Sequence, residues 1–359
     1  METYTYRLPV VGQAFVDLIE GMHPRMTLDG FAGKYVVVCC FGSSQISPGR
    51  TALDVVRRHK RDFDDRKTCF LGVAVDPREK VESQPQTGIQ YYFDKDGSIS
   101  RQCGAAPREA VPLGTQYRVT WTIVDPSLHV LAHFHTGADN AECEAVFSLL
   151  DGLPDPDSFE TCEIPAPVLV LPRLFEPDFC DKLVGLYEEG HPRDSGFMRN
   201  NKEIFDHSFK RRRDYFIEDK TVMEIILKRI SICVIPEIRK LFFMEITRME
   251  RYLIGCYAAE DEAHFRPHRD NGQTVTAHRR FALSVALNED YGGGELLFPE
   301  YNRRHHKVPK GWGIVFPCAI LHAVNQVTKG RRYAFLPFLF DEAAAKTKAE
   351  IVGGEARPP

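Results

Sequence analysis

A stretch rich in proline, glycine and aspartate divides the 359-residue chain into two halves whose apolar residues follow different patterns. The stretch starts with Asp151–Asp157 and ends with Ile164–Pro167. This composition is typical of a linker between separately packed domains, and a chain of this length favours two hydrophobic cores over one. We predict four parts: a first domain over 1–155, a linker over 156–168, a second domain over 169–342 and a flexible tail over 343–359.

The first half alternates continuous apolar runs with helical patterns. Tyr35–Phe41 and Cys69–Val75 are apolar along their whole length, as expected for strands that are covered on both faces. Between them, Thr51–Phe63 has apolar residues at helical spacing, and Ala141–Leu150 has the pattern of a closing helix. The order strand, helix, strand predicts a right-handed parallel crossover in an α/β domain.

Short stretches of this half resemble the peroxiredoxin (AhpC/TSA) family, over about residues 6–150. The stretches that carry the resemblance are Gly33-Lys34, Phe93–Gly97 and Arg118–Pro126. The resemblance implies a thioredoxin-like fold. Peroxiredoxins carry their reactive cysteine after the first strand, but here Ser43–Thr51 has Arg50 at about that position. A guanidinium cannot replace a thiolate nucleophile, so we predict a scaffold or docking module and not a peroxidase.

Ten cysteines are scattered over the chain without a CxxC pair. This usage predicts reduced thiols in a cytoplasmic protein and not a disulfide framework. Cys39-Cys40 lie within an apolar run, where buried packing is the expected role. A thiol-dependent peroxidase that uses Cys39, Cys40 or Cys69 is the alternative function of this half, with Cys103 as a further substitute thiol.

Charge and hydropathy exclude several partner classes. The net charge of −4 and the isoelectric point near 6.4 give no nucleic-acid or membrane signature. No apolar run has transmembrane length, and no signal peptide pattern is visible. We expect neither a nucleic-acid nor a membrane partner. Basic clusters at Lys210–Arg213, His278–Arg280 and Arg303–Lys307 predict solvated faces, with an anionic substrate or partner as the alternative.

The second half begins with helical patterns and continues with short strands. Helices are expected from Glu176 and over Thr221–Ile235, where Pro236 interrupts or ends the helix. The expected strands are Arg251–Tyr257, Arg280–Leu287, Glu295–Phe298, Gly313–Phe316 and Arg332–Phe340. Helices followed by many short strands predict a double-stranded β-helix, or jelly roll, that is braced by helices.

His268 and Asp270 stand two residues apart in this half, and His322 follows on another expected strand. Side chains two apart on an extended segment point to the same face, so His268 and Asp270 can reach one metal ion. Two histidines and one carboxylate can occupy one face of iron(II) and leave the opposite face open. The three residues therefore predict an oxygen-activating iron site.

Arg332 lies ten residues beyond His322, at the start of a run that is apolar on both faces. An unpaired buried charge is costly, and no acid nearby in the sequence is an obvious partner. A guanidinium fork suits a carboxylate, so Arg332 predicts a bound dicarboxylate, 2-oxoglutarate. Arg331 is expected to face the opposite side. Ala282, Ser284 and Ala286 share one strand face, where small side chains leave volume for a ligand, although close packing of the sheets explains them equally well.

Residues 165–342 resemble prolyl 4-hydroxylase-type 2-oxoglutarate/Fe(II) dioxygenases. The motifs that carry the resemblance are Cys256-Tyr257, His264-Phe265, His268–Asn271, Leu287-Asn288, Gly293–Pro299, Val308–Gly311, Phe316-Pro317, Leu321-His322, Val327–Gly330 and Arg332-Tyr333. The resemblance implies that His268, Asp270 and His322 bind iron, that Arg332 pairs with the distal carboxylate of 2-oxoglutarate, and that Tyr257 contacts this cosubstrate. Where the family has a tyrosine the chain has Ala286, and Ser284 is the expected replacement contact.

The implied reaction couples oxidative decarboxylation of 2-oxoglutarate by O2 to hydroxylation of a C–H bond, with succinate and CO2 as products and ascorbate as a possible reductant. The substrate stays open: a prolyl or other amino-acid residue, a peptide or protein, or an acidic small molecule. A non-catalytic sensor that binds iron and 2-oxoglutarate is an alternative. A nucleic-acid dealkylase is disfavoured because Phe338 stands where such enzymes carry a second arginine. The sequence does not indicate the oligomeric state.

Overall fold

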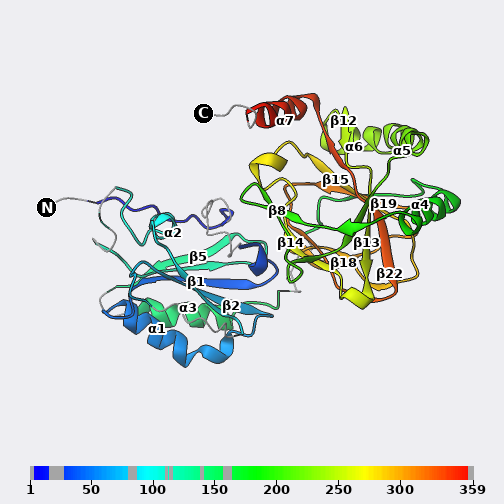
Figure 1. Cartoon of the computed structure of the whole chain (residues 1–359). Coiled ribbons are helices and arrows are strands. Elements are labelled where there is room, and N and C mark those ends of the chain that lie inside the picture. Colours follow the sequence, from blue (N-terminus) through cyan, green and yellow to red (C-terminus); the bar gives the residue numbers. More distant parts are fainter. Residues whose placement is uncertain are drawn as a thin grey trace. The chain divides into compact units, whose positions relative to one another are not determined.

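The computed structural model describes residues 4–15, 28–79, 87–109, 112, 116–137, 141–156 and 164–354. The chain forms two compact units (Figure 1). Unit 1 comprises Met1–Ile164 with Pro299–Asn302, and unit 2 comprises Pro165–Phe298 with Arg303–Pro359. The change of unit at Ile164 falls within the expected linker, of which 157–163 lie outside the described residues.

Unit 1 contains, within its described residues, one five-stranded sheet in the order β3-β2-β1-β4-β5. Strand β1 pairs in parallel with β2, and β2 in parallel with β3, whereas β4 and β5 run antiparallel. The elements are β1 (Tyr35–Gly42), α1 (Gly49–Arg58), β2 (Thr68–Ala74), β3 (Ile89–Phe93), α2 (Ser98–Gln102), β4 (Thr120–Val124), β5 (Val130–His135) and α3 (Ala141–Asp151). The expected parallel crossover from β1 through α1 to β2 is confirmed.

The sheet of unit 1 is covered on both faces, as its continuous apolar strands predict. Alternate residues of β1 enter two different cores: Val37 and Cys39 pack with α1 and α3, and Val36 and Cys40 pack on the other side. Figure 1 shows α1 and α3 together on one face of this sheet. The expected helix Thr51–Phe63 is shorter, because α1 ends at Arg58 and only a 3₁₀ turn follows.

Unit 2 is built around two larger sheets, a β-rich architecture that agrees with the expected jelly roll at this coarse level. A five-stranded sheet has the order β10-β14-β20-β17-β18, and a nine-stranded sheet runs β12-β23-β15-β22-β13-β11-β7, with β19 paired to β15 and β6 paired to β19. The strands are β6 (Leu169–Leu171), β7 (Arg193–Asp194), β8 (Phe197–Arg199), β9 (Lys202–Ile204), β10 (Lys210–Arg211), β11 (Arg213–Phe216), β12 (Arg248–Glu250), β13 (Leu253–Ala258), β14 (His264–His268), β15 (Phe281–Ala286), β16 (Gly292–Gly293), β17 (Leu296–Phe298), β18 (Asn302–His306), β19 (Gly313–Pro317), β20 (His322–Val324), β21 (Val327–Lys329), β22 (Arg331–Phe335) and β23 (Phe338–Phe340).

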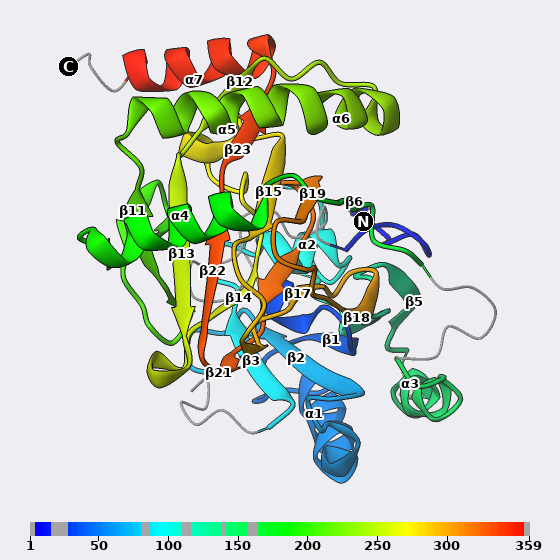
Figure 2. The ribbon, with the colours of Figure 1, turned by 90° about the vertical axis from the view of Figure 1, so that its right-hand side faces the viewer.

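Helices cover the larger sheet of unit 2. Their bounds are α4 (Pro177–Glu189), α5 (Lys220–Cys233), α6 (Ile235–Phe242) and α7 (Glu342–Gly354). Helix α4 runs beside β13 and β22 in Figure 2, and its Tyr187 ring packs edge-on against Tyr333 of β22. Phe242 of α6 packs against Phe281 of β15. No helix in the described part of the chain is long and apolar enough to cross a bilayer.

Two expectations for unit 2 need correction. The expected strand Arg332–Phe340 is broken into β22 and β23 around Pro337, since proline has no N–H to donate to a strand neighbour. The segment expected to be a flexible tail, 343–359, is instead helical as far as Gly354. Its Lys348 donates to the partly buried Glu250, and this contact holds the helix to the unit.

Candidate metal centre

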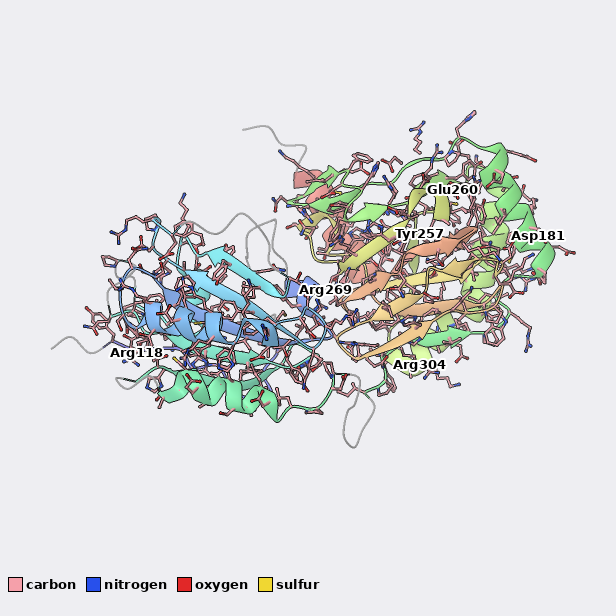
Figure 3. The ribbon with its side chains drawn as sticks, turned by 90° about the horizontal axis from the view of Figure 1, so that it is seen from below. Arg118, Asp181, Tyr257, Glu260, Arg269 and Arg304 are labelled. Carbon is pink, nitrogen blue, oxygen red and sulfur yellow. The ribbon has the colours of Figure 1, made fainter. Side chains whose placement is uncertain are left out.

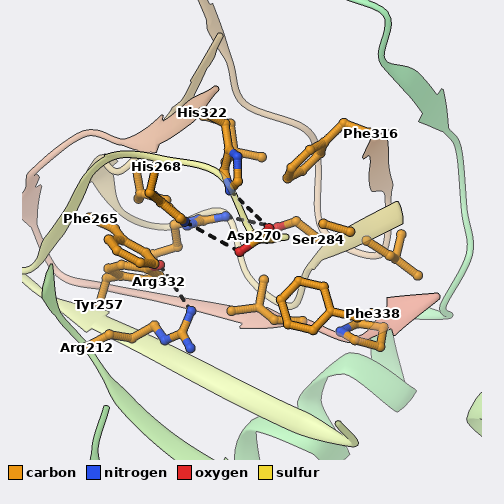
Figure 4. A pocket seen from close by; sticks show the side chains of 16 residues that line it. Arg212, Tyr257, Phe265, His268, Asp270, Ser284, Phe316, His322, Arg332 and Phe338 are labelled. Carbon is orange, nitrogen blue, oxygen red and sulfur yellow. Dashed lines mark hydrogen bonds and ion pairs between the residues drawn. The ribbon is translucent and has the colours of Figure 1, made fainter. Parts of the chain in front are cut away.

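His268, Asp270 and His322 converge within unit 2, with one ligand atom from each lying within 4.8 Å of the others. Strands β14 and β20 are neighbours in the smaller sheet, and their register places His268 directly opposite His322. The Asp270 carboxylate lies 3.6 Å from His268 Nε2 and 3.3 Å from His322 Nε2 (Figure 4). The structure therefore brings together the three residues that the sequence singles out as metal ligands.

The loop after β14 carries Asp270, a detail that the sequence prediction missed. The strand ends at His268, and Asp270 lies in a turn and not on the expected extended segment. Its backbone N–H donates to the carbonyl of Cys318 at 3.0 Å, and its own carbonyl accepts from Arg279 Nη1 at 3.3 Å. These contacts fix the turn, so the carboxylate still reaches both imidazoles.

Both imidazoles present Nε2 to the site because the opposite nitrogen, Nδ1, faces a backbone carbonyl. His268 Nδ1 lies 2.8 Å from the carbonyl of Arg266, and His322 Nδ1 lies 3.2 Å from that of Ile320. An N–H on Nδ1 donates to such a carbonyl and leaves the Nε2 lone pair free for a metal ion. This arrangement is typical of histidines that bind metals.

Burial and charge keep His268 and Asp270 in their metal-binding protonation states. Burial, together with the nearby His322, lowers the pKa of His268 to about 4, so its ring is neutral at pH 7. Burial alone would raise the pKa of Asp270, but His322 and His268 hold that pKa well below its usual range. Neutral imidazole and ionised carboxylate are the forms that bind a divalent cation.

A cavity opens in front of the three ligands (Figure 4). Most of its wall is apolar or aromatic, which excludes water from the ligands. The Phe265 ring stacks on His268 with centroids 3.4 Å apart. The lining residues are Arg212, Tyr257, Phe265, His268, Asp270, Ala282, Leu283, Ser284, Leu296, Phe316, His322, Val324, Arg332, Leu336, Pro337 and Phe338. Of the small residues expected to face a ligand, Ala282 and Ser284 belong to this lining, whereas Ala286 does not.

Arg332 enters the cavity from β22 and is only 5% exposed. Its Nη2 donates to Ser284 Oγ at 3.1 Å, and its guanidinium lies over the Tyr257 ring, 5.2 Å from the centroid. Its other terminal nitrogen, Nη1, is buried and has no hydrogen-bond partner among the described residues. Gly294 leaves room for this side chain, since a Cβ there would lie 3.1 Å from Arg332 Cδ.

The unpartnered Nη1 is a test of whether a dicarboxylate fits the cavity. Leaving a charged donor buried without an acceptor costs more than the 1–3 kcal/mol or so of a neutral group. A carboxylate with two acceptor oxygens satisfies the guanidinium, so the residues present fit 2-oxoglutarate. Arg331, by contrast, is exposed and pairs at 2.6 Å with Glu260, which is labelled in Figure 3.

Arg212 is a cavity residue that sequence reasoning did not find. It was counted in the cluster Lys210–Arg213, for which a solvated face is expected, but Lys210 and Arg212 are buried and only Arg213 is fully exposed. Arg212 pairs with Asp214 through Nε at 2.6 Å and through Nη2 at 2.8 Å. An arginine with an aspartate two residues later, at a strand boundary, is the only sequence signal for this pair.

The second basic cluster, His278–Arg280, is also largely buried, contrary to the expectation of a solvated face. His278 and Arg279 both contact Glu250, at 3.0 and 2.8 Å. Burial lowers the pKa of His278, whereas the neighbouring cations outweigh burial at Glu250 and lower its pKa to about 2. Arg303–His305 of the third cluster are exposed as expected.

In unit 1, Arg50 lies in the segment where a peroxiredoxin has its reactive cysteine. Arg50 is exposed, and its Nε donates to the Ser44 carbonyl at 3.3 Å. Cys39, Cys40, Cys69 and Cys103 are all buried. Burial raises the pKa of Cys39 well above its usual value and that of Cys69 to about 12. The Cys40 thiol, beside the Cys103 thiol and buried, also has a raised pKa.

Comparison with known protein families matches residues 252–340 to the 2OG-Fe(II) oxygenase superfamily. The matched segment contains the three candidate metal ligands, Arg332, Tyr257 and Ser284, but not Arg212. A PKHD-type hydroxylase of Synechococcus sp. (strain JA-2-3B'a(2-13)) is 29% identical over 147 residues, which is 38% of this chain and 58% of that protein. A PKHD-type hydroxylase of Gluconacetobacter diazotrophicus is 33% identical over 107 residues, 28% of this chain and 47% of that protein. The chain thus spans about half the length of these relatives.

Solved structures that align with part of the chain include a prolyl hydroxylase from Trichoplax adhaerens in complex with a peptide fragment of hypoxia inducible factor. It is 17% identical, with a TM-score of 0.42, and the alignment covers 51% of this chain and 86% of that one. A prolyl-4-hydroxylase from Pseudomonas putida is 14% identical with a TM-score of 0.37, covering 49% of this chain and 94% of that one.

Proposed function

We propose that the chain is an Fe(II)- and 2-oxoglutarate-dependent dioxygenase that hydroxylates a C–H bond and releases succinate and CO2. The observation that carries the proposal is the buried Nη1 of Arg332, which has no partner among the described residues and belongs to a side chain that lines the cavity of the three metal donors. The superfamily match over 252–340, and relatives that are named hydroxylases, support the same reaction type.

Each group then has a defined task. His268, Asp270 and His322 hold iron(II), and the contacts of the two Nδ1 atoms keep the Nε2 lone pairs aimed at it. When bound with 2-oxoglutarate, iron(II) supplies the activation of O2 that C–H hydroxylation requires. Arg332, held by Ser284, binds the distal carboxylate, and Tyr257 contacts the same cosubstrate. Ascorbate is proposed as a reductant that keeps the metal in the ferrous state.

The apolar wall of the cavity protects this chemistry from water. Phe316 and Phe298 pack on His322, with ring centroids 4.6 and 6.5 Å away, and Phe265 covers His268. Removing water from the site strengthens the attraction between Arg332 and a carboxylate, because the local dielectric constant falls. We propose an amino-acid residue, a peptide or a small molecule as the substrate that faces the metal.

For unit 1 we propose a thioredoxin-like scaffold or docking module without peroxidase activity. The order of its elements supports the thioredoxin-like assignment, with a parallel crossover followed by two antiparallel strands. Cys39, Cys40 and Cys69 are buried and their pKa values are raised, whereas a peroxidatic cysteine needs an accessible thiolate.

Anaerobic titration tests the proposed function. We expect Fe(II) and 2-oxoglutarate together, but neither alone, to give the visible charge-transfer band of a chelated 2-oxo acid. Absence of this band in the wild-type protein at saturating ligand would refute the proposal. Succinate release should then be screened against amino acids, peptides and cell extract. A protein that gives the band but never releases succinate is a sensor and not an enzyme.

A further inference from the structure

The role of Arg212 follows from where the chain passes between the two sheets of unit 2. Strand β10 pairs with β14, which carries His268, and β11 pairs with β13, which carries Tyr257. Arg212 is the single residue between β10 and β11. Its side chain therefore starts at the transition between the metal-binding sheet and the cosubstrate sheet, and it lines the cavity.

The guanidinium of Arg212 is held in one orientation by buried partners. Nε and Nη2 form a bidentate pair with Asp214, at 2.6 and 2.8 Å. Ser195 donates to the same carboxylate, and Lys210 Nζ donates to Ser195 Oγ at 2.6 Å. A bidentate pair leaves an arginine little freedom to rotate, so the position of the remaining nitrogen, Nη1, is fixed.

That remaining nitrogen lies 3.4 Å from the hydroxyl of Tyr257, whose ring also faces the Arg212 guanidinium with 5.7 Å to the centroid. An arginine can only donate hydrogen bonds. The phenolic oxygen of Tyr257 is therefore the acceptor in this contact, and its own O–H remains as a donor. Tyr257 is 1% exposed, and this hydroxyl has no other partner among the described residues.

Two buried donors thus lack an acceptor in one cavity: the Tyr257 hydroxyl and Nη1 of Arg332. Both side chains line the cavity, and the two guanidiniums approach the same Tyr257 ring. A protein oxygen near Tyr257 would compete for its proton, but Arg212 offers only N–H groups. An anionic ligand with carboxylate oxygens satisfies both donors.

We infer that Arg212 is a positioning residue, which donates to Tyr257 and thereby directs the Tyr257 proton to a carboxylate oxygen of 2-oxoglutarate. The inference rests on the proposed function, since it assumes that this dicarboxylate occupies the cavity.

A double-mutant cycle with 2-oxoglutarate as the titrant tests the inference. Affinity is measured anaerobically, by the charge-transfer band with Fe(II) and by calorimetry with Mn(II). Tyr257→Phe and Arg212→Lys should each weaken 2-oxoglutarate binding about tenfold, the effect of one lost buried hydrogen bond. Because both act through one hydroxyl, the double variant should bind about as weakly as either single variant. Metal affinity without 2-oxoglutarate should be unchanged.

The neighbouring Arg213→Gln is the matched control, because Arg213 is exposed and donates to the carbonyl of Pro192. It should keep wild-type affinity. If Arg212→Lys misfolds, Arg212→Met with Asp214→Asn removes both buried charges together and takes its place in the cycle. Wild-type affinity in the Arg212 variant, or losses that multiply in the double variant, would overturn the inference. Failure of the wild type to bind 2-oxoglutarate would instead overturn the proposed function.

Discussion

The two units differ in the kind of buried polar atom that they leave without a partner among the described residues. In unit 1 these atoms belong to Gln102, Thr120 and His133, which lie on different elements. All three are neutral, since burial lowers the pKa of His133 to about 4. In unit 2 one such atom is the charged Nη1 of Arg332, within the cavity of three metal donors. The others there, on His278, Arg280 and His306, lie outside the cavity lining.

This difference indicates which buried atoms without a hydrogen-bond partner are evidence of a ligand site. A neutral buried group without a partner costs about 1–3 kcal/mol, which a domain of this size can tolerate as imperfect packing. A buried charge costs several kcal/mol unless a counter-charge is supplied. Only the second kind, combined with converging side chains, identifies a site. The predictions below test this distinction, beginning with the metal ligands themselves.

The largest effect is expected at the metal ligands. His268→Ala should remove one of three donors and lower Fe(II) or Mn(II) affinity by more than about 100-fold, since changes of outer contacts alone cost 10–100-fold. Calorimetry and the charge-transfer band measure the loss. His264→Ala is the matched control, because this partly buried histidine lies on the same strand and its ring nitrogens face backbone carbonyls. Equal losses in both variants would show that β14 unfolds and that the triad is not a metal site.

A smaller but specific effect is expected at Arg332. Arg332→Ala should leave metal binding intact and lower the affinity for 2-oxoglutarate by about 100-fold. The distal carboxylate then lacks a buried charged partner that contributes about 3 kcal/mol to binding. Titration of 2-oxoglutarate into the Mn(II)-loaded protein measures the change. The neighbouring Arg331→Ala should have little effect, since Arg331 is exposed and pairs with Glu260. An Arg332 variant with unchanged affinity would mean that its unpaired Nη1 has no ligand.

Sequence reasoning identified the candidate site because its residues belong to short, local patterns. His268 and Asp270 stand two apart, and Arg332 begins an apolar run that offers it no acid. The parallel crossover of unit 1 was likewise predictable, because fully buried strands are apolar without interruption. These signals depend on composition and spacing, which a single sequence contains.

Features that depend on contacts between distant segments were not predictable. The cluster Lys210–Arg213 appears solvated in the sequence, yet Lys210 is buried. Its ammonium donates to Ser195 Oγ and to the Gly196 carbonyl, two acceptors that reach it only in the folded unit. Helix α7 was expected to be a flexible tail, because its partner Glu250 lies far away in the chain. A charged side chain is buried where folding brings a partner close to it, and the local sequence does not indicate which distant residue that partner is.

Glu250 tests the opposite case, a partly buried charge whose partners are all present. It accepts from His278, Arg279 and Lys348, and these neighbours lower its pKa from 4.5 to about 2 against the effect of burial. A carboxylate whose pKa is lower in the folded state than in the unfolded state stabilises the folded state at every pH above the unfolded-state pKa. This stabilisation is lost as the pH falls through the folded-state pKa. Glu250→Gln should therefore lower the free energy of unfolding by about 3 kcal/mol at pH 7.

Urea unfolding as a function of pH measures this cost. The difference between wild type and Glu250→Gln should shrink between about pH 4.5 and pH 2, the window set by the two pKa values. Glu342→Gln is the control, because Glu342 forms an exposed pair with Arg248. It should leave the stability at pH 7 nearly unchanged. A Glu250 variant as stable as wild type across this range would contradict the assignment of a fully satisfied, partly buried charge.

The smallest effect is expected at the thiols of unit 1. With its pKa raised to about 12, Cys69 has a thiolate fraction of roughly 1 in 10,000 at pH 8. Burial raises the pKa of Cys39 well above its usual value, and the Cys103 thiol together with burial does the same for Cys40. The wild-type protein should therefore consume hydrogen peroxide no faster than a Cys40→Ser variant, in an assay with a thiol reductant. Peroxide consumption that disappears in Cys39→Ser, Cys40→Ser or Cys69→Ser would restore the peroxidase alternative. It would also show that unit 1 contains a reactive site although its unpartnered buried atoms, on Gln102, Thr120 and His133, are neutral, which would contradict the distinction drawn between the two units.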